Sequence, residues 1–101
     1  MIYETTKWRK KREKILRRDG YKCQLCYRYG KQTTATTVHH ILPYGEAPNL
    51  GFEDYNLISI CKVCHGKMHD RTGEKLSKEG IELLQRTFRK YNKQIPNQYR
   101  S

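Results

Sequence analysis

Eight side chains that can bind a metal ion are gathered in one stretch of this 101-residue chain. All four cysteines and all four histidines lie between positions 23 and 69, as Cys23, Cys26, His39, His40, Cys61, Cys64, His65 and His69. Two Cys-x-x-Cys pairs have the spacing at which both sulfurs of a pair reach one Zn²⁺, and four thiolates complete a structural zinc site. The imidazoles then remain available for an open site, where a divalent ion can do chemistry.

A structural ion matters because the apolar core must be small. Apolar residues make up 36% of the chain and charged residues 31%, and a chain of this length buries only about two thirds of the surface that its unfolded form exposes. Structural zinc contributes about 10–16 kcal/mol of apparent binding energy to domains of this kind. We therefore expect one domain over residues 1–101, poorly folded without its zinc.

The charge of the chain favours a polyanionic partner. Lysine and arginine number 21 against 10 acidic residues, which gives a formal charge of +11, and such a field concentrates nucleic acid around a protein. Most of the basic residues lie near the two ends of the sequence. We expect phosphate contacts from nine of them: Lys7, Arg9, Lys10, Lys11, Lys14, Arg17, Arg18, Lys67 and Arg71.

Other classes of protein are disfavoured. No stretch approaches the roughly 20 apolar residues of a membrane span, and the first residues lack the basic-then-apolar pattern of a signal peptide. We expect a cytoplasmic protein with neither a membrane nor a small-molecule substrate as its partner. In a reducing compartment, paired Cys-x-x-Cys motifs favour metal binding over disulfides.

The periodicity of the sequence predicts the elements that position these residues. Residues 5–20 form a basic helix with Trp8, Ile15 and Leu16 on one apolar stripe, ended by Asp19-Gly20. Two strands follow the pattern of β-branched residues, at 33–42 and at 56–60, separated by the turn-rich loop 44–55. If residues 65–69 are helical, the imidazoles of His65 and His69 lie on the same face.

The last third of the chain predicts one more helix and a loose tail. Leu76 and Ile81 flank Ser77 as in a hydrophobic staple around an N-cap, which opens a helix over 77–93. Its stripe of Ile81, Leu84, Phe88 and Tyr91 is expected to be core. Residues 95–101 have no pattern and are expected to be loose, whereas residues 21–75 hold the cysteine pairs and the histidines.

Taken together, these residues resemble the His-Asn-His (HNH) motif of the ββα-metal endonucleases. The resemblance is carried by His39-His40-Ile41, Asn56-Leu57 and Cys64-His65-x-x-x-His69. The flanking Trp8, Arg12, Arg18-Asp19-Gly20 and Cys23-Gln24-Leu25-Cys26 resemble the small phage-encoded members, so that the match covers about residues 5–75. It implies an α+β fold: a small ββα-metal (His-Me finger) core with a structural zinc held by the four cysteines and with flanking basic helices.

The resemblance also implies a role for each matching residue. The position of His40 is that of the general base, and Asn56 matches the residue that ties the loop between the two strands. His39 and His65 match ligands of one catalytic divalent ion. His69 is either a third ligand or a contact to the scissile phosphate. A positioned base typically contributes about 10²–10⁴-fold to the rate.

The identity of the catalytic ion stays open between several metals. Many family members carry Asp at the position of His39, whereas the colicin-type nucleases carry His, as this chain does. Carboxylate and water ligands suit Mg²⁺, while three imidazoles favour Zn²⁺, Ni²⁺ or Mn²⁺. The sequence thus predicts one structural Zn²⁺ and one catalytic cation from this group of four.

The function implied is metal-dependent hydrolysis of DNA, by nicking or double-strand cleavage, with low sequence specificity of its own. Members of this size, encoded by phages or bacteria, often act with the large terminase subunit in genome packaging, so the resemblance names that subunit as a candidate partner. The alternative is a non-catalytic zinc-knuckle module that binds nucleic acid or acts as an adaptor. Cleavage of RNA is a third interpretation, disfavoured because the aromatic residues form no clear stacking platform.

Overall fold

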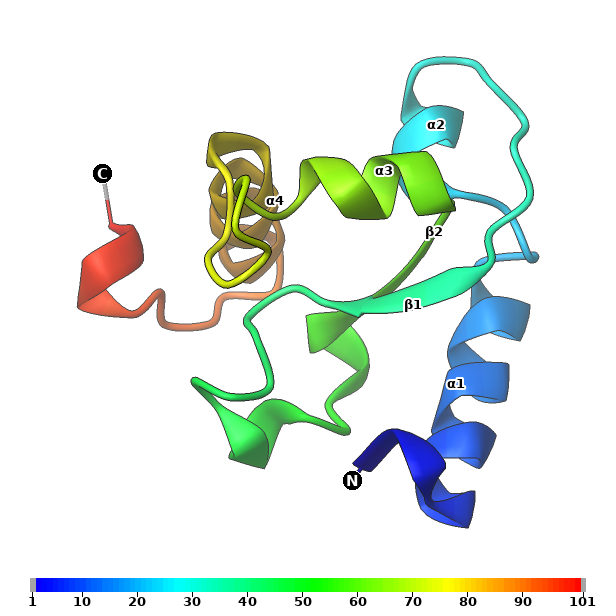
Figure 1. Ribbon diagram of the computed structural model, residues 1–101, viewed down its shortest axis with the longest axis horizontal. Coiled ribbons are helices and arrows are strands. Elements are labelled where there is room, and N and C mark those ends of the chain that lie inside the picture. Colours follow the sequence, from blue (N-terminus) through cyan, green and yellow to red (C-terminus); the bar gives the residue numbers. More distant parts are fainter. Residues whose placement is uncertain (1, 101) are drawn as a thin grey trace.

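A two-stranded antiparallel sheet lies at the centre of the protein in a computed structural model that describes residues 2–100 (Figure 1). The strands are β1 (Thr37–His40) and β2 (Leu57–Ile60). The α-helices are α1 (Thr6–Arg18), α2 (Gln24–Arg28), α3 (Lys62–Lys67) and α4 (Lys78–Lys90). Four short 3-10 helices complete the order: η1 (Ile2–Glu4), η2 (Pro48–Leu50), η3 (Asp54–Asn56) and η4 (Asn97–Tyr99). The α+β architecture expected from the sequence is confirmed.

The register of the sheet places the two neighbouring histidines on opposite faces. Thr37 pairs with Ile60, and His40 pairs with Leu57. Because side chains alternate along a strand, His39 lies on the face covered by α3 and His40 on the face toward α1. The first strand is shorter than the predicted 33–42, since only 37–40 find partners on β2; an isolated bridge joins Thr34 to Lys22 instead.

Helix α1 packs its apolar stripe on the outer face of the sheet. Trp8, Ile15 and Leu16 are buried together with Val38 and Leu57, as the stripe predicted. At its start, the side chain of Thr5 accepts the backbone N–H of Trp8. The helix ends where Asp19-Gly20 was expected to end it: Gly20 has φ +65°, a conformation that favours glycine, and the last carbonyl groups are closed by a Schellman pattern.

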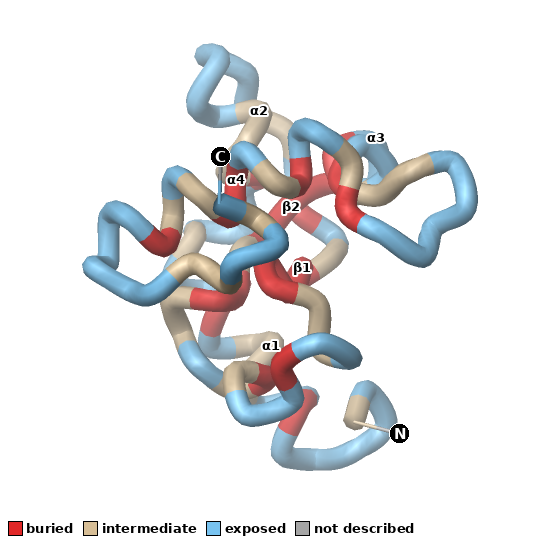
Figure 2. Tube along the Cα trace, turned by 90° about the vertical axis from the view of Figure 1, so that its left-hand side faces the viewer, coloured by how far each residue is buried: buried red, intermediate tan, exposed pale blue. Residues whose placement is uncertain are grey.

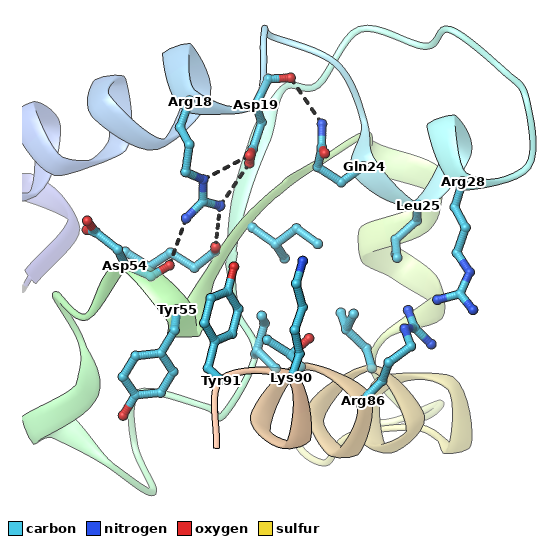
Figure 3. Close-up of a pocket in the computed structure, with 15 residues that line it drawn as sticks. Arg18, Asp19, Gln24, Leu25, Arg28, Asp54, Tyr55, Arg86, Lys90 and Tyr91 are labelled. Atoms are coloured by element: carbon cyan, nitrogen blue, oxygen red, sulfur yellow. Dashed lines mark hydrogen bonds and ion pairs between the residues drawn. The ribbon is translucent and has the colours of Figure 1, made fainter. Parts of the chain in front are cut away.

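Arg18, at the end of α1, covers the free edge of β2. Its guanidinium donates to the backbone carbonyls of Asp54 and Leu57, at 2.8 and 2.7 Å, and is held by the carboxylate of Asp19 at 2.9 Å (Figure 3). An unpaired strand edge is a template for unwanted strand pairing. Arg18 thus protects this edge and fixes the helix to the sheet.

Helix α4 closes the other layer of the core, with one difference from its predicted stripe. Ser77 caps it by accepting the backbone N–H of Gly80, a position where a Cβ would collide with the carbonyl oxygen of Met68. The side chains of Leu83, Leu84 and Phe88 are fully covered, whereas that of Tyr91 is 47% exposed. The prediction of Tyr91 as core was therefore wrong, because α4 ends at Lys90 and Tyr91 only caps it, whereas Leu83, outside the predicted stripe, is buried.

The C-terminal segment, expected to be loose, carries η4 and packs against the rest of the chain. The hydroxyl of Tyr99 donates to the carboxylate of Glu46 at 2.6 Å, and Gln85 donates to the backbone carbonyl of Tyr99 at 2.7 Å. These partners lie far away in sequence, so that local pattern alone could not indicate them.

Burial follows the sheet and the inner faces of the helices, and the loops are exposed (Figure 2). Between residues 2 and 100, no helix is long and apolar enough to cross a membrane.

Candidate metal-dependent active site

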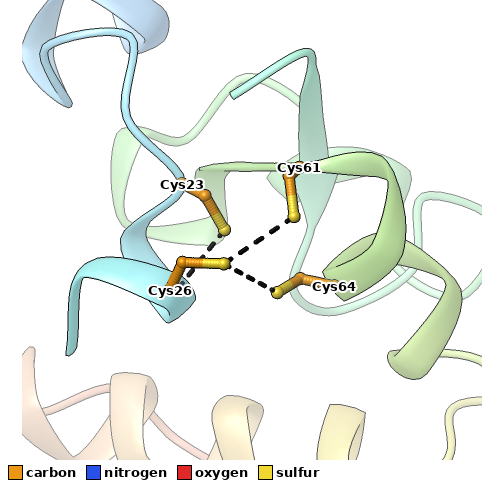
Figure 4. A group of neighbouring side chains, drawn as sticks. All are labelled: Cys23, Cys26, Cys61 and Cys64. Carbon is orange, nitrogen blue, oxygen red and sulfur yellow. Dashed lines mark hydrogen bonds between the residues drawn. The ribbon is translucent and has the colours of Figure 1, made fainter. Parts of the chain in front are cut away.

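The four cysteines converge at one point from three elements. Cys23 precedes α2 and Cys26 lies on it, Cys61 follows β2, and Cys64 lies on α3 (Figure 4). All four sulfurs lie within 4.8 Å of one another, and Cys26 Sγ is 3.8 Å from Cys61 Sγ and 3.6 Å from Cys64 Sγ. Four thiolates at about 2.3 Å from a tetrahedral Zn²⁺ are separated by about 3.8 Å. The cluster therefore fits a structural zinc.

The surroundings of the thiols also suit a metal. The backbone N–H of Cys64 lowers the pKa of Cys61, which favours the thiolate that binds metal, whereas burial raises the pKa of Cys64. Cys23 is completely covered, and Cys61 and Cys64 are buried. The cluster joins α2 to the end of β2 and the start of α3, so that an ion held there cross-links the parts of the chain that the small core connects weakly.

Three histidines form a second group, separate from the thiols. His39 on β1 faces His65 on α3 and His69 just beyond it, with one ring nitrogen from each lying within 4.8 Å of the others. His65 Nε2 and His69 Nε2 are 3.4 Å apart, close to the separation of two nitrogens that each lie about 2.1 Å from one ion. The expected four-residue spacing does bring these two imidazoles to one face.

The ring of His39 is the best indication that this group binds a metal ion. Its side chain is buried, and its Nε2 has no hydrogen-bond partner among residues 2–100. Buried polar atoms are nearly always satisfied, by protein, water or an ion. Burial, with the neighbouring imidazoles of His65, His69 and His40, lowers the pKa of His39 to about 3. The ring is thus neutral, which is the form that ligates a metal.

His40 lies beside this group but takes no part in it. Its Nε2 is 3.1 Å from the carbonyl oxygen of Gly51, and its Nδ1 is 3.2 Å from the hydroxyl of Tyr3. A carbonyl only accepts, so Nε2 carries the proton and Nδ1 carries the free lone pair. The ring stacks on Trp8 with centroids 5.0 Å apart. Burial lowers the pKa of His40, and the bond to Gly51 offsets part of this effect.

Asn56 fastens the loop that supplies the Gly51 carbonyl. It is fully buried; its Oδ1 accepts the backbone N–H of Leu42 at 2.7 Å, and its Nδ2 donates to the carbonyls of Leu42 and Leu50 at 3.1 and 3.3 Å. One side chain thereby joins the end of β1 to the loop residue that precedes Gly51. These hydrogen bonds are consistent with the loop-tying role that the family resemblance implied for Asn56.

A cleft of about 510 Å³ is lined by both His40 and the three-histidine group. Tyr3, Trp8 and Tyr44 form an aromatic wall around His40, and the side chains of Arg9 and Arg12 lie at the rim. No carboxylate among residues 2–100 lines it. With two guanidiniums and no acidic group, the cleft suits an anion such as a phosphodiester.

The basic residues of α1 are less free than the sequence indicated. Lys11 and Lys14 both contact the carboxylate of Asp54, at 2.7 and 3.2 Å, and Arg17 contacts Glu13 at 3.4 Å. Exposed pairs of this kind are weak, so phosphate can compete for Lys14 and Arg17. Arg18, by contrast, is engaged by backbone carbonyls and by Asp19, and its place at the β2 edge is structural.

The other predicted phosphate contacts are more accessible. Lys10, Lys67 and Arg71 are exposed and form no ion pair within the described part of the chain. Lys7 lies over the ring of Phe52, 4.3 Å from its centroid. Arg9 makes one long contact, of 3.5 Å, to the backbone carbonyl of Glu4.

Two residues of the cleft were missed as site residues. Arg12 entered only as part of the family resemblance, yet it lies in the cleft and donates to the Thr36 carbonyl at 2.9 Å. Tyr3 reaches His40 from 37 positions away in sequence. Neither has a local pattern that indicates this position; for Arg12, the helical spacing of four from Trp8 was the one usable signal.

Comparisons with known proteins agree with this arrangement. A family model described as HNH endonuclease matches residues 23–71, which contain both metal-competent groups. The chain is also similar to a solved structure, the crystal structure of the HNH endonuclease of the deep-sea thermophilic bacteriophage GVE2 with manganese ion. The two are 34% identical, the match covers 63% of this chain and 70% of that one, and the TM-score is 0.62. Among curated proteins there is no significant match.

Proposed function

The chain belongs to the HNH endonuclease family, and from this premise we propose that it hydrolyses DNA phosphodiester bonds with His40 as the general base. The observation that carries the proposal is the hydrogen bonding of His40. A carbonyl fixes the proton on Nε2, and Nδ1 then presents a lone pair in the same cleft as the three-histidine group. The base and the candidate electrophile site are thus neighbours, but they share no ligand.

The step begins with His40 in its neutral form. Nδ1 takes a proton from water, and the water oxygen forms a bond to phosphorus while the bond from phosphorus to the 3′ oxygen breaks. The departing 3′ oxygen takes up a proton from solvent, and His40 later returns its own proton to solvent, so that the products are a 5′-phosphate and a 3′-hydroxyl. The imidazolium that forms donates through both nitrogens, and the Gly51 carbonyl, fastened through Leu50 and Asn56, stabilises it.

The three imidazoles fit a divalent cation. His39, His65 and His69 would hold it, and when bound it supplies positive charge against a phosphate oxygen and the departing 3′ oxygen. A set of neutral nitrogens favours Mn²⁺, Ni²⁺ or Zn²⁺ over Mg²⁺. The manganese ion of the GVE2 protein is consistent with this preference.

Tyr3 stands where the attacking water has to be. Its hydroxyl donates to Nδ1 of His40 at 3.2 Å, and one lone pair cannot accept from this hydroxyl and from a water at full strength. We propose that Tyr3 withdraws from Nδ1 when substrate binds. Its short 3-10 helix has no buried residue, so the contacts of its ring with Trp8 and His40 are the packing that this movement has to break.

Binding of the substrate is assigned to cationic side chains around the cleft. Arg9 and Arg12 at its rim would hold the phosphates that flank the scissile one, and Lys10, Lys67 and Arg71 would extend this contact. Such contacts fix the position of the backbone without reading sequence. We therefore expect low intrinsic specificity. Nicking or double-strand cleavage and association with a large terminase subunit remain predictions from the family resemblance.

A plasmid-nicking assay tests the proposal. Purified zinc-loaded protein is incubated with supercoiled DNA and Mg²⁺, Mn²⁺, Ni²⁺ or Zn²⁺. We expect cleavage with at least one of these ions, its abolition by EDTA, and a loss of about 10²–10⁴-fold in His40→Ala. Zinc content and thermal unfolding of the variant show whether the fold is retained.

The same assay separates the enzyme from the non-catalytic binding module. A binding module would shift the DNA in a gel equally well with or without His40. It would not cut the DNA with any of the four ions. Wild-type protein that binds DNA but leaves the plasmid intact with every ion would refute the proposed function.

A further inference from the structure

A second cleft lies at the free edge of β2, the edge that does not pair with β1. It has a volume of about 480 Å³, lies between α2 and α4, and shares no lining residue with the catalytic cleft. Its floor includes Leu25, Ile58 and Leu83. We call it the β2-edge cleft.

Three cations converge on this cleft from two helices. Arg28 of α2 and Arg86 of α4 extend toward each other, and Lys90, one helical turn after Arg86, points into the same space (Figure 3). None of the three forms an ion pair with a carboxylate of residues 2–100. Partial burial and the charge of Arg28 lower the pKa of Arg86. Like charges are held together here without a partner of opposite sign.

The acidic groups of the cleft do not neutralise these cations. Asp19 is bound by Arg18, and Asp54 is bound by Lys11 and Lys14. Glu82 lies one turn before Arg86 on α4 and favours its charged form, but the two form no ion pair. The cleft therefore keeps a net positive charge, carried by exposed side chains that an anionic ligand can reach.

We propose that the β2-edge cleft binds the phosphodiester backbone of DNA at a second place, remote from the bond that is cut. The choice of DNA as occupant rests on the proposed function. Two guanidinium forks and one ammonium group approach the cleft from separate elements, which suits the several oxygens of a phosphate. Arg86 and Lys90 are about 6 Å apart along the helix axis, a distance that spans about two phosphates at 3.4 Å of rise per strand.

An acidic protein segment is the competing occupant. DNA is favoured because the enzyme already holds this polyanion at its other cleft, so a second segment, or a bent end of the same one, is present at high effective concentration. The cleft also offers hydroxyl groups, from Thr87 and Tyr91, as further donors to phosphate oxygens.

The proposal predicts an effect on DNA affinity and none on bond breaking. The three cations touch no residue of the catalytic cleft, so their removal should weaken binding while the rate at saturating DNA stays unchanged. On long DNA, two-sided engagement should also add to the number of counterions released. The dependence of affinity on salt reports that number, at about 0.9 per phosphate contact.

The experiment measures binding of fluorescein-labelled duplex DNA by anisotropy over a range of salt concentrations. The zinc-loaded protein carries His40→Ala so that the DNA stays intact, and no second ion is added. Against this background we compare Arg28→Ala/Arg86→Ala with Lys78→Ala/Arg89→Ala. The second pair removes the same charge from exposed positions of α4 that line none of the described clefts.

We expect the cleft variant to bind roughly ten-fold more weakly at low salt and to lose about 2 from the slope of log K against log salt. The α4 control should lose much less. Arg28→Lys/Arg86→Lys, which keeps the charge, should retain most of the slope and shows that any loss is not one of folding. An unchanged affinity and slope in the alanine variant would overturn the proposal.

Two further results separate the DNA proposal from an acidic protein partner and from failure of the proposed catalytic function. Tight binding of polyglutamate that depends on Arg28 and Arg86, with DNA binding unaffected, would assign the cleft to an acidic protein and overturn the DNA proposal. Failure of the wild-type enzyme to cut DNA concerns the catalytic cleft alone. The affinity comparison stands or falls independently of that result.

Discussion

The two metal-competent groups of this protein differ in how completely they are enclosed. The thiol group is almost entirely buried, and its sulfurs lie at the spacing of a closed tetrahedral site. In the imidazole group, His39 is buried with an unsatisfied nitrogen, while His65 and His69 are only partly covered and open into a cleft. The contrast favours the thiol group as the place for a closed, structural ion and the imidazole group as the place where an ion would be open to a substrate.

One short helix connects the two groups. Cys64 and His65 are consecutive residues of α3 and point to different groups. Loss of the structural ion should therefore displace a catalytic ligand, whereas loss of the catalytic ion leaves the thiol group intact. Substitutions in the thiol group and in the imidazole group can test this asymmetry separately.

The largest effect is expected from the thiol side. Cys23→Ser removes a ligand that is completely buried, and zinc binding of this kind contributes about 10–16 kcal/mol of apparent folding energy. We expect the variant to lose its zinc and its cooperative thermal transition, with no activity. His65→Ala serves as the control and should keep both zinc and transition. Circular dichroism and elemental analysis measure the two properties; a folded Cys23→Ser variant with full zinc would contradict the comparison.

A smaller loss of stability is expected from the loop tie. Asn56→Ala leaves the backbone N–H and carbonyl of Leu42 buried without their partner, at about 1–3 kcal/mol for each unsatisfied group. Urea unfolding should report a loss of about 2–6 kcal/mol, together with a drop in cleavage rate because the Gly51 carbonyl moves. The exposed loop residue Asn49 provides the control as Asn49→Ala. Equal stability and rate in both variants would show that Asn56 does not hold the loop.

The pH dependence tests whether His40 is buried in its neutral form, as the proposed base requires. Burial lowers the pKa of His40 below its ordinary value of 6.5, and only the neutral ring accepts a proton. The single-turnover rate should stay constant as pH falls to 6.5 and decrease below it. Stability should fall over the same range, because the unfolded chain takes up a proton that the folded state resists. A rate that declines already above the ordinary histidine pKa would be inconsistent with a buried base.

The smallest effect concerns Tyr3. In Tyr3→Phe the hydroxyl that occupies Nδ1 of His40 is removed while the aromatic wall remains. One hydrogen bond is worth about 0.5–1.5 kcal/mol, so the cleavage rate should rise by about two- to ten-fold. Tyr29→Phe, which alters an exposed ring far from the cleft, is the control. A reduced rate in Tyr3→Phe would mean that the hydroxyl assists the water instead of displacing it.

The sequence predicted which cysteines and histidines come together, because each group depends on local spacing. The Cys-x-x-Cys pairs, the four-residue step from His65 to His69, the stripe of α1 and its end at Gly20 all follow from the geometry of one segment. The family is likewise indicated by short motifs. Expectations of this kind agree with the structure wherever one element carries the whole signal.

What the sequence could not predict depends on contacts between distant segments. The hydrogen bond from Tyr3 to His40 and the one from Tyr99 to Glu46 join residues 37 and 53 positions apart. A basic pattern could not separate Arg18, whose partners are backbone carbonyls of η3 and β2, from the freely exposed Lys10. Nor does periodicity decide between Leu83 and Tyr91 as the core residue of α4, since both lie near its apolar stripe.

The central claim is that two separate ions divide the work, one for the fold and one for hydrolysis. It is tested most directly by measuring zinc content, thermal unfolding and plasmid cleavage on His39→Ala/His65→Ala. We predict about one zinc per chain, a cooperative transition close to that of the wild type, and no cleavage with any added divalent ion. A variant that loses its zinc and its fold together with these imidazoles would contradict the claim.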